Sequence, residues 1–558
     1  MRIDIAVLAS LSLSLALPAA AAELPVEVRR PAERAGELEL RLRPLAVASL
    51  LELAQADLAG FPLSDGSCAD LELERLDLAQ LELGLSVDGS PAPGLLEGLD
   101  LTVWRGRVAG REDSQVALSF SQAGVHGWIL VDGVLHHLLS RGADELWIVS
   151  EERLLELGGE RGNPCASDAL PENRQAPRSA PSSGGTKAYS PSLYVCPIAI
   201  ETDYQLHQVF GNSLPAQTAY VTSLLTWASY RYEDQIGTVL TYPYVQFYTT
   251  PNDPWKAQDN GGNCIDVLYE FQAAWANNIP AGGQIGHMLS GANLGCGVAW
   301  LPGLCNAPWN FSVSGNIDGT VAFPVQVSPS NWDFMVLTHE VGHNFNALHT
   351  HDYCPPLDEC APSGYFGGCQ TQQACTAQGT IMSYCHLCPG GLSNITTYFH
   401  PASVSDMRSW VESTCLALYG PDPAPYCVAK LNSLGCVPAI GWEGHPTLSG
   451  LDDFAVTAEL VLNNQNGLLF YGTGAASKPF QGGVLCVSTP LKRTAVQGSG
   501  GNPPPSSDCS GTFRYAWTHA QLGKFGAGAT VYVQYWYRDP QAPGGSGLSN
   551  ALAFTVAN

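Results

Sequence analysis

Three histidines and a glutamate within residues 339–349 constrain this chain more than any other feature of its sequence. Ser330, with Asp333 three residues later, is a helix-capping signature, so we expect a helix that starts at Ser330 and continues through the first two histidines. His339 and His343 are four residues apart and should lie on one face of that helix. This spacing suits two ligands of one zinc ion.

The third histidine requires the helix to stop. His349 is six residues past His343, so on a continuous helix it would point away from the metal. We place the turn at Asn346, because Asn adopts the left-handed conformation that ends helices more readily than most residues other than Gly. Three imidazoles and an open fourth position make a catalytic zinc site. His351 is an alternative third ligand that we rank below His349.

Three further residues have candidate roles at this site. Glu340 follows His339 and can reach a metal-bound water, so we expect it to be the general base. Met382 lies 33 residues after the third histidine, a distance that suits a turn beneath the metal, although a lone Met is usually core filler. Tyr384 could hydrogen-bond the oxyanion or approach the zinc, or it could simply pack against the helix.

The pattern His339-Glu340-x-x-His343-x-x-Asn346-x-x-His349, together with Met382, resembles the zinc signature and Met-turn of metzincin metallopeptidases, especially the secreted reprolysin/adamalysin-like enzymes. Residues 194–212 and 284–291 resemble the first strand and helix and the middle segment of that catalytic domain, and residues 101–137 resemble a reprolysin-type propeptide. The resemblance covers roughly residues 100–415. It implies an α/β metzincin-like domain, with a twisted mixed sheet, an active-site helix and a Met-turn, that hydrolyses internal peptide bonds.

Two residues depart from the family pattern. Asn346 replaces the usual Gly, and Thr350 stands where reprolysins carry Asp directly after the third histidine. The Met-x-Tyr order of Met382 and Tyr384 is more typical of astacin- and serralysin-like members, and by that analogy Tyr384 would support the transition state. The subfamily therefore stays open.

The N-terminus indicates export. Arg2 precedes a 13-residue apolar run, followed by Pro18 and a string of small residues, which together are typical of a secretory signal peptide over residues 1–22. The 17 cysteines favour an oxidising compartment. We therefore expect a secreted protein, extracellular or periplasmic or associated with the cell surface, without a membrane span.

Patterning along the chain predicts three domains after the signal peptide. Alternation in residues 37–42 and apolar runs in 101–110 and 114–121 predict an antiparallel β domain, which the family resemblance implies is a propeptide. A strand, helix, strand order over 193–248 predicts an α/β domain. Two Pro-rich stretches, at residues 171–191 and 420–425, mark the domain boundaries. The first contains two arginines that we expect to be exposed, and it is a plausible processing site. The two arginines are Arg174 and Arg178. The expected domains are a propeptide with linker (23–185), a metallopeptidase domain (186–420) and a C-terminal β-sandwich (421–558).

Cysteine positions suggest a latency device. Cys165 is the nearest cysteine upstream of the catalytic domain, and in several metzincins a propeptide thiolate occupies the open position on the zinc. Cys165 is our candidate for this cysteine switch, although an inert thiol or a disulfide to the central domain is also compatible with the odd cysteine count. In the tail the simplest pairs are Cys427 with Cys436 and Cys486 with Cys509, while sequence alone does not fix the connectivity.

These observations predict a secreted zinc endopeptidase, made as a zymogen, that acts on proteins or peptides through water activated by Glu340. In one alternative the chain is a gluzincin peptidase, whose third zinc ligand would be a downstream Glu such as Glu359. In the other alternative it is not an enzyme but a catalytically silent, protease-like extracellular binding protein. A net charge of −25 argues against nucleic-acid partners. The C-terminal domain could attach the enzyme to a surface or be purely structural, and calcium is compatible with such an enzyme but no residue pattern points to it.

Overall fold

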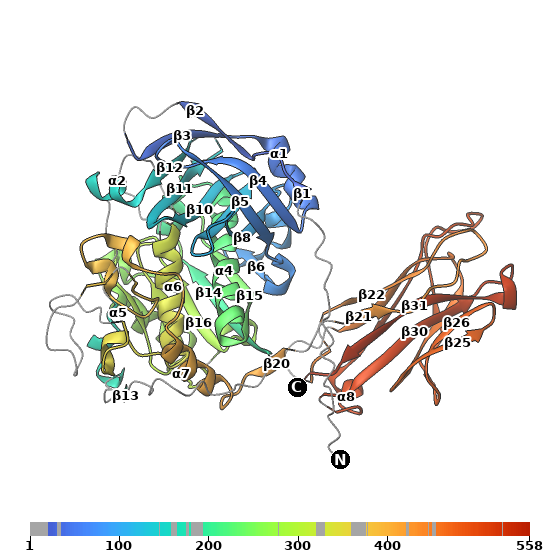
Figure 1. Cartoon of the computed structure of the whole chain (residues 1–558). Coiled ribbons are helices and arrows are strands. Elements are labelled where there is room, and N and C mark those ends of the chain that lie inside the picture. The colour runs from blue at the N-terminus through green and yellow to red at the C-terminus, as the bar shows by residue number, and fades with distance from the viewer. Residues whose placement is uncertain are drawn as a thin grey trace, which may run out of the picture. The chain divides into compact units, whose positions relative to one another are not determined.

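The computed structural model describes residues 20–30, 35–143, 145–157, 165–173, 178–179, 193–276, 278–317, 319, 330–358, 375–376, 378–419, 423–444, 446–448, 454–526 and 528–557. Most of the expected signal peptide and Glu359 therefore lie outside the described residues. The chain forms two compact units, the first built mainly from residues up to Trp410 and the second mainly from Val411 onward. Figure 1 shows the elements of each.

The N-terminal part of the first unit is dominated by a ten-stranded sheet, antiparallel throughout except for its first pair. The expected strand at residues 37–42 is β3, and its alternate side chains Leu38, Leu40 and Leu42 are buried in an apolar core. Short helices α1 (Pro44–Ser49) and α2 (Glu151–Glu156) accompany the sheet. Its strands, in spatial order, are β1 (Ala20–Ala21), β4 (Gln55–Pro62), β5 (Cys68–Arg75), β8 (Thr102–Val108), β9 (Gln115–Ser121), β10 (Gly124–Val131), β11 (Val134–Gly142), β12 (Glu145–Ser150), β3 (Glu37–Leu42) and β2 (Val26–Arg30).

A second, mixed sheet carries the metallopeptidase-like part of this unit. Its strands run in the order β17 (Gly297–Ala299), β18 (Phe311–Ser314), β16 (Ile285–Leu289), β14 (Leu193–Thr202), β15 (Thr238–Phe247), β6 (Leu85–Val87) and β7 (Ser90–Pro91), with β20 (Ala417–Tyr419) also paired to β14. Strands β14, β16 and β18 are parallel, whereas β17 is antiparallel to β18. The strand, helix, strand order expected over residues 193–248 is present as β14, α4 (Leu214–Ile236) and β15.

Two strands of this second sheet come from the region predicted as propeptide. Strand β6 pairs in parallel with β15, and Gly84, just before β6, exchanges main-chain hydrogen bonds with Tyr242 and Val245. A Cβ atom on Gly84 would meet the carbonyl of Pro243, so only Gly allows the two chains to approach this closely. The N-terminal region is thus continuous with the catalytic sheet at this edge, which period-two patterning could not indicate.

Helices cover the second sheet. Tyr220, Leu224, Ala228 and Tyr232, the predicted stripe of α4, are all buried, and the hydroxyl of Tyr232 donates to the carbonyl oxygen of Thr338 in α6 (Ser330–Asn344) at 2.9 Å. The remaining helices are α3 (Tyr204–Val209), α5 (Cys264–Trp275) and α7 (Pro401–Val411). Within the described ranges, no helix is both long and apolar enough to cross a membrane.

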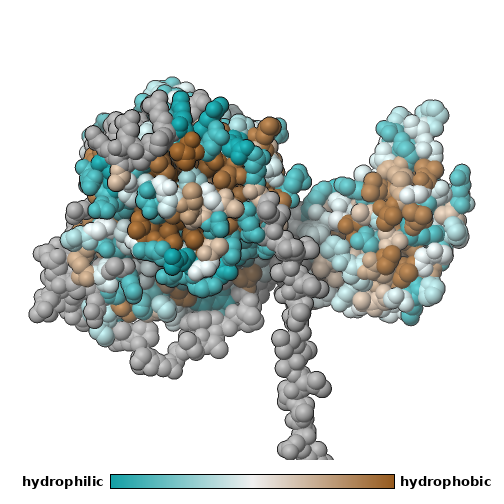
Figure 2. All heavy atoms as spheres, turned by 45° about the horizontal axis from the view of Figure 1, so that its top comes forward, coloured by the Kyte–Doolittle hydropathy of each residue, from teal (hydrophilic) through white to brown (hydrophobic). Residues whose placement is uncertain are grey.

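The second unit is built mostly from strands. A six-stranded sheet contains β21 (Ala424–Tyr426), β31 (Ser546–Thr555), β30 (Thr530–Arg538), β24 (Asn466–Gly472), β27 (Lys492–Arg493) and β28 (Gln497–Gly498), and a smaller sheet contains β22 (Ala439–Glu443), β23 (Ala455–Val461) and β29 (Gly511–Ala516). A hairpin of β25 (Ala475–Phe480) and β26 (Gly483–Val487) and a short helix α8 (His519–Leu522) complete the unit. Figure 2 shows apolar side chains gathered on one face of this unit.

The disulfides of this unit differ from the simplest sequence pairing. Cys427 bonds Cys486 and Cys436 bonds Cys509, so the predicted pairs of sequence neighbours are wrong. The physical reason is that strand pairing brings segments 59 and 73 residues apart in sequence to Cα separations of 6.2 and 6.6 Å. Attachment to a surface through this unit stays a prediction.

Candidate active site

The two helical histidines stand on α6, as the sequence predicts. This helix begins at Ser330 and ends at Asn344, and Asn346 has a φ of 76°, the left-handed conformation expected at the turn. The amide of Ala347 then donates to the carbonyl of Gly342 at 2.9 Å, which closes the helix end. The chain therefore changes direction at Asn346, which brings His349 next to the two helical histidines.

The three imidazoles converge. Nε2 of His343 lies 3.1 Å from Nε2 of His349, and candidate ligand atoms of His339, His343, His349 and the Cys165 thiol all lie within 4.8 Å of one another. Nε2 of His339 is buried and has no hydrogen-bond partner among the described residues. A metal ion would satisfy this orphaned atom, and the three nitrogen donors are those that zinc accepts.

Burial and hydrogen bonding prepare the two helical imidazoles to bind a cation. Their Nδ1 atoms lie 2.7 Å from the carbonyl oxygens of Ile381 and Ala347, so Nδ1 carries the proton and Nε2 is left as the ligand. Burial lowers the pKa of His343 to about 3 and that of His339 well below its ordinary value. Both rings are therefore neutral, the form that coordinates metals.

Glu340 lies beside the histidine cluster and is almost completely buried. Its Oε2 is 3.4 Å from the hydroxyl of Ser167, whereas its Oε1 is buried without a hydrogen-bond partner in the described part of the chain. Burial raises the pKa of Glu340 to about 8. A Cβ atom on Gly297 of β17 would lie 2.4 Å from this Oε1, so the absence of a side chain at 297 makes room for the carboxylate.

Met382 lies against helix α6, and Tyr384 contacts His349 and Cys165. Met382 is fully buried, and its sulfur lies 2.8 Å from where a Cβ on Gly342 of α6 would be. Its carbonyl accepts from the amide of Thr350 at 3.0 Å. The hydroxyl of Tyr384 lies 3.2 Å from Nε2 of His349 and donates to the carbonyl of Cys165 at 3.0 Å.

Cys165 carries a free thiol, so the alternative of a disulfide to the central domain is wrong. Its sulfur is 3.5 Å from both Nε2 of His343 and Oε2 of Glu340. Burial and the charge of Glu340 raise the pKa of this thiol to about 12, so it is protonated unless a cation binds beside it.

The segment that carries Cys165 lies along the edge strand β17. The amide of Ala166 donates to Gly297 O at 2.8 Å, and the amide of Ala299 donates to the hydroxyl of Ser167 at 2.9 Å. Asn173 is buried, and its side-chain amide donates to Ala299 O at 2.7 Å. Residues 165–173, which we call the covering segment, therefore lie along the edge of β17, with Cys165 next to the histidines.

The predicted linker is more ordered at one point than its composition indicated. Arg178 is half-buried, and its guanidinium donates to Asp406 and to both the carbonyl and the side-chain oxygens of Asn346 at 2.7–2.8 Å. The prediction that Arg178 is exposed is wrong, because its guanidinium binds the turn that ends α6. A processing site in residues 171–191 stays a prediction. Arg174 lies outside the described residues.

An acidic residue that sequence reasoning missed contacts the third histidine. Oδ1 of Asp168 in the covering segment lies 3.1 Å from Nδ1 of His349, and Oδ2 of Asp352 lies 3.5 Å from the same nitrogen. Burial disfavours a charged His349, but the charge and hydrogen bond of Asp168 outweigh burial and hold its pKa well above the ordinary value. His351, the alternative ligand, does not join the three-histidine cluster. Its ring stacks on that of His349, with 5.0 Å between the ring centroids.

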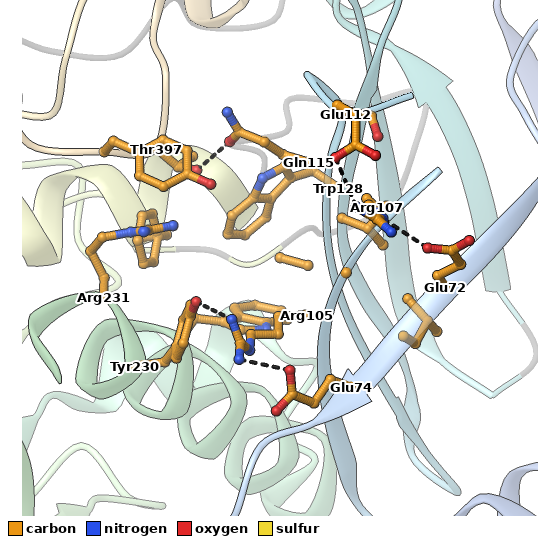
Figure 3. Close-up of a pocket in the computed structure, with 18 of the residues that line it drawn as sticks. Glu72, Glu74, Arg105, Arg107, Glu112, Gln115, Trp128, Tyr230, Arg231 and Thr397 are labelled. Atoms are coloured by element: carbon orange, nitrogen blue, oxygen red, sulfur yellow. Dashed lines mark hydrogen bonds and ion pairs between the residues drawn. The ribbon is translucent and has the colours of Figure 1, made fainter. Parts of the chain in front are cut away.

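The N-terminal sheet contacts α4 and the segment that contains Thr397 through polar and aromatic groups (Figure 3). The guanidinium of Arg105 in β8 lies 4.3 Å from the ring centroid of Tyr230 in α4 and donates to its hydroxyl. The hydroxyl of Thr397 donates to Gln115 in β9 at 2.6 Å. A cavity of about 690 Å³ lies between these contacts.

Comparison with known proteins agrees with this geometry. The family model of metallopeptidase family M12, of reprolysin type, matches residues 192–399, which include the three histidines, Met382 and Tyr384. This segment belongs to the reprolysin-type M12 metallopeptidases. The M12 family and the histidine cluster together fit a catalytic metal and protein substrates.

Solved structures give weaker matches. Metalloproteinase-II from Bacteroides fragilis matches at 12% identity over 53% of this chain and 81% of its own, with a TM-score of 0.29. A structure described as a chaperone-substrate complex matches at 14% identity over 39% of this chain and 34% of its own, with a TM-score of 0.22. Both scores are below 0.5, so the M12 assignment depends on the family model. No curated protein matches the chain.

Proposed function

We propose that this chain is a secreted zinc-dependent endopeptidase, made as a latent precursor, that hydrolyses internal peptide bonds. The observation that carries the proposal is the orphaned Nε2 of His339 beside His343, His349 and Glu340. His339, His343 and His349 would hold the ion. Bound there, zinc would polarise the scissile carbonyl and acidify a water molecule.

In this proposal Glu340 moves the proton. A cation held by the three histidines would favour the carboxylate form of Glu340. Its Oε1, which has no hydrogen-bond partner among the described residues, would then accept a proton from the attacking water as the new carbon–oxygen bond forms. It then gives that proton to the amine nitrogen as the peptide bond breaks, so the residue returns to its starting form. Burial keeps the pKa of Tyr384 well above its ordinary value, so the hydroxyl stays protonated and can donate to the developing oxyanion.

The covering segment supplies latency. The Cys165 thiol is placed with the three histidines, so in the precursor it would be a fourth ligand and would exclude water. The Tyr384 hydroxyl is occupied by the Cys165 carbonyl, so the proposed oxyanion donor is blocked at the same time. Activation requires this segment to leave.

The proposal is tested with the full chain, by measuring cleavage of a quenched fluorescent protein substrate together with bound zinc. We expect the wild type to bind one zinc and to cleave slowly, and Cys165→Ser to cleave at least ten times faster. Cys68→Ser, which alters an exposed free thiol in β5, is the matched control and should not change the rate.

Adding Glu340→Gln to Cys165→Ser should abolish cleavage while one zinc remains bound. If the Cys165→Ser chain binds zinc but cleaves nothing, before or after removal of the covering segment by an added protease, then the silent binding protein is the better description. If the wild type binds no zinc, or if His349→Ala binds it as tightly, the metal site itself is wrong.

A further inference from the structure

The three histidines differ in the hydrogen-bond partner of Nδ1, the ring nitrogen that faces away from the cluster. Nδ1 of His339 and of His343 each donates to a main-chain carbonyl, at 2.7 Å in both cases. Nδ1 of His349 instead faces two carboxylates, Asp168 at 3.1 Å and Asp352 at 3.5 Å. The third histidine is thus the one whose orientation depends on side chains.

The two carboxylates come from different parts of the chain. Asp352 ends the 3₁₀ turn Thr350–Asp352 that follows His349, and its amide donates to the His349 carbonyl at 3.1 Å. Because residues three apart eclipse in such a turn, its carboxylate returns to the histidine that precedes it. Asp168 belongs to the covering segment, and its side chain is 57% exposed, compared with 28% for Asp352.

We propose that Asp352 is the positioning residue for His349 in the active enzyme, and that Asp168 takes over this hydrogen bond while the covering segment is in place. The inference rests on the proposed metal site. A carboxylate that accepts the outer N–H of a ligating histidine fixes its ring and strengthens the nitrogen as a donor, and its loss typically costs 10- to 100-fold in metal affinity.

The two distances indicate which carboxylate holds His349 in each state. In the precursor Asp168 lies closer to Nδ1 by 0.4 Å, the difference between 3.1 and 3.5 Å. When the covering segment leaves, His349 loses this partner at the same moment as the Cys165 sulfur leaves the cluster. A second carboxylate on the catalytic domain keeps the ring oriented, so that metal is retained as the site opens.

The test is a double-mutant cycle in the full chain, with Asp168→Ala, Asp352→Ala and the double variant. Zinc affinity is measured by competition with a chromophoric chelator, and the visible spectrum of the Co²⁺-loaded chain reports ligand geometry. Each single variant should stay within about threefold of wild type, because one carboxylate remains. The double variant should lose 10- to 100-fold in affinity and change its Co²⁺ spectrum.

Asp358→Ala is the matched control, because the carboxylate of Asp358 accepts hydrogen bonds from the main-chain amide and the hydroxyl of Thr380. It should leave the affinity and the spectrum unchanged. Thermal unfolding of the metal-free variants should stay near wild type, which separates positioning from a general loss of fold.

Three results would overturn the inference. A double variant that holds zinc as tightly as wild type would show that neither carboxylate positions the ring, while the metal site stands. Additive losses in the two single variants would show that the carboxylates do not substitute for each other. Two zinc ions per wild-type chain, reduced to one by Asp352→Ala, would show that Asp168, His349, His351 and Asp352 hold a second ion instead. A wild type without zinc would count against the proposed function.

Discussion

At the scale of single residues, the site depends on the empty space at Gly297. This residue lies on β17, the strand next to the covering segment, and its missing side chain gives Glu340 room. General-base catalysis requires the carboxylate to stay within hydrogen-bond reach of its water. The position of Glu340 is therefore set partly by a residue without a side chain.

Gly297→Ala should push the Glu340 carboxylate away from its present position, because the new Cβ would lie 2.4 Å from Oε1. We expect kcat to fall about 100-fold, the usual effect of an ångström-scale misplacement, with one zinc still bound. Steady-state kinetics and metal analysis in the Cys165→Ser background check this. Gly498→Ala, where a Cβ meets nothing within 4 Å, is the control, and equal losses in both would remove the role of Gly297.

At the scale of elements, α6 and the chain beneath it act as one support. Met382 packs against Gly342 and also binds the Thr350 amide, so the same turn contacts both the helix and the residue after the third histidine. His339 is fixed to the neighbouring carbonyl of Ile381. The turn therefore helps to hold His349 in place relative to the histidines of α6.

Met382→Ala should lower the free energy of unfolding by about 2–5 kcal/mol, because it opens a cavity under α6. Met382→Leu preserves the volume and should cost less than about 1.5 kcal/mol. Denaturant unfolding of both variants provides the comparison. An Ala variant as stable as the Leu variant would mean that this turn does not support the helix.

The end of strand β14 should make stability depend on pH. Burial raises the pKa of Glu201 to about 8 and that of Asp203 to about 6, and Trp255 and Ser290 donate hydrogen bonds to them. Because the folded state holds these protons more tightly than the unfolded state, their contribution is complete below about pH 4 and is lost as the pH rises through 6 and 8.

Glu201→Gln should therefore reduce the fall in the free energy of unfolding between pH 5 and pH 8. Urea unfolding of wild type and variant at both values measures the difference, which cancels the titration of groups common to both chains. If the two chains lose stability in parallel, Glu201 is not the group responsible.

Local elements could be predicted from the sequence, while partners distant in sequence could not. The start of α6, the turn at Asn346 and the stripe of α4 follow from residue order and capping preferences within a few residues. Asp168 lies 181 residues before His349, and its approach depends on how the covering segment lies on β17. The pairing of β6 with β15 and the tail disulfides have the same long-range origin.

At the scale of the first unit as a whole, the latency that we propose depends on how firmly the N-terminal sheet is held. Arg105 and Arg107 both lie on β8, but they face different partners. Arg105 stacks on Tyr230 of the catalytic part and also pairs with Glu74 of β5 at 2.7 Å, whereas Arg107 pairs with Glu72 and Glu112 (Figure 3). Both arginines have ion pairs within the N-terminal region, but of the two only Arg105 stacks on Tyr230, so Arg107→Ala is the control for Arg105→Ala.

Arg105→Ala should expose the covering segment more often, since a cation–π contact of about 0.5–1 kcal/mol is lost. We expect Cys165 to react with a thiol reagent about 2–5 times faster, measured in a Cys68→Ser background so that the exposed thiol is silent. Arg107→Ala should leave the rate unchanged. Equal acceleration in both variants would indicate loosening of the sheet rather than of its docking.

The pairing of β6 with β15 has a consequence for how the enzyme can be produced. A chain that begins at residue 193 would lack β6 and β7 and would present β15 as a bare sheet edge, with unpaired amides and carbonyls along residues 245–247. Exposed edges of this kind invite pairing with other copies. The N-terminal region covers this edge in the whole chain. Preparing the enzyme by cleavage of the whole chain should therefore give less aggregate than expressing the catalytic part alone.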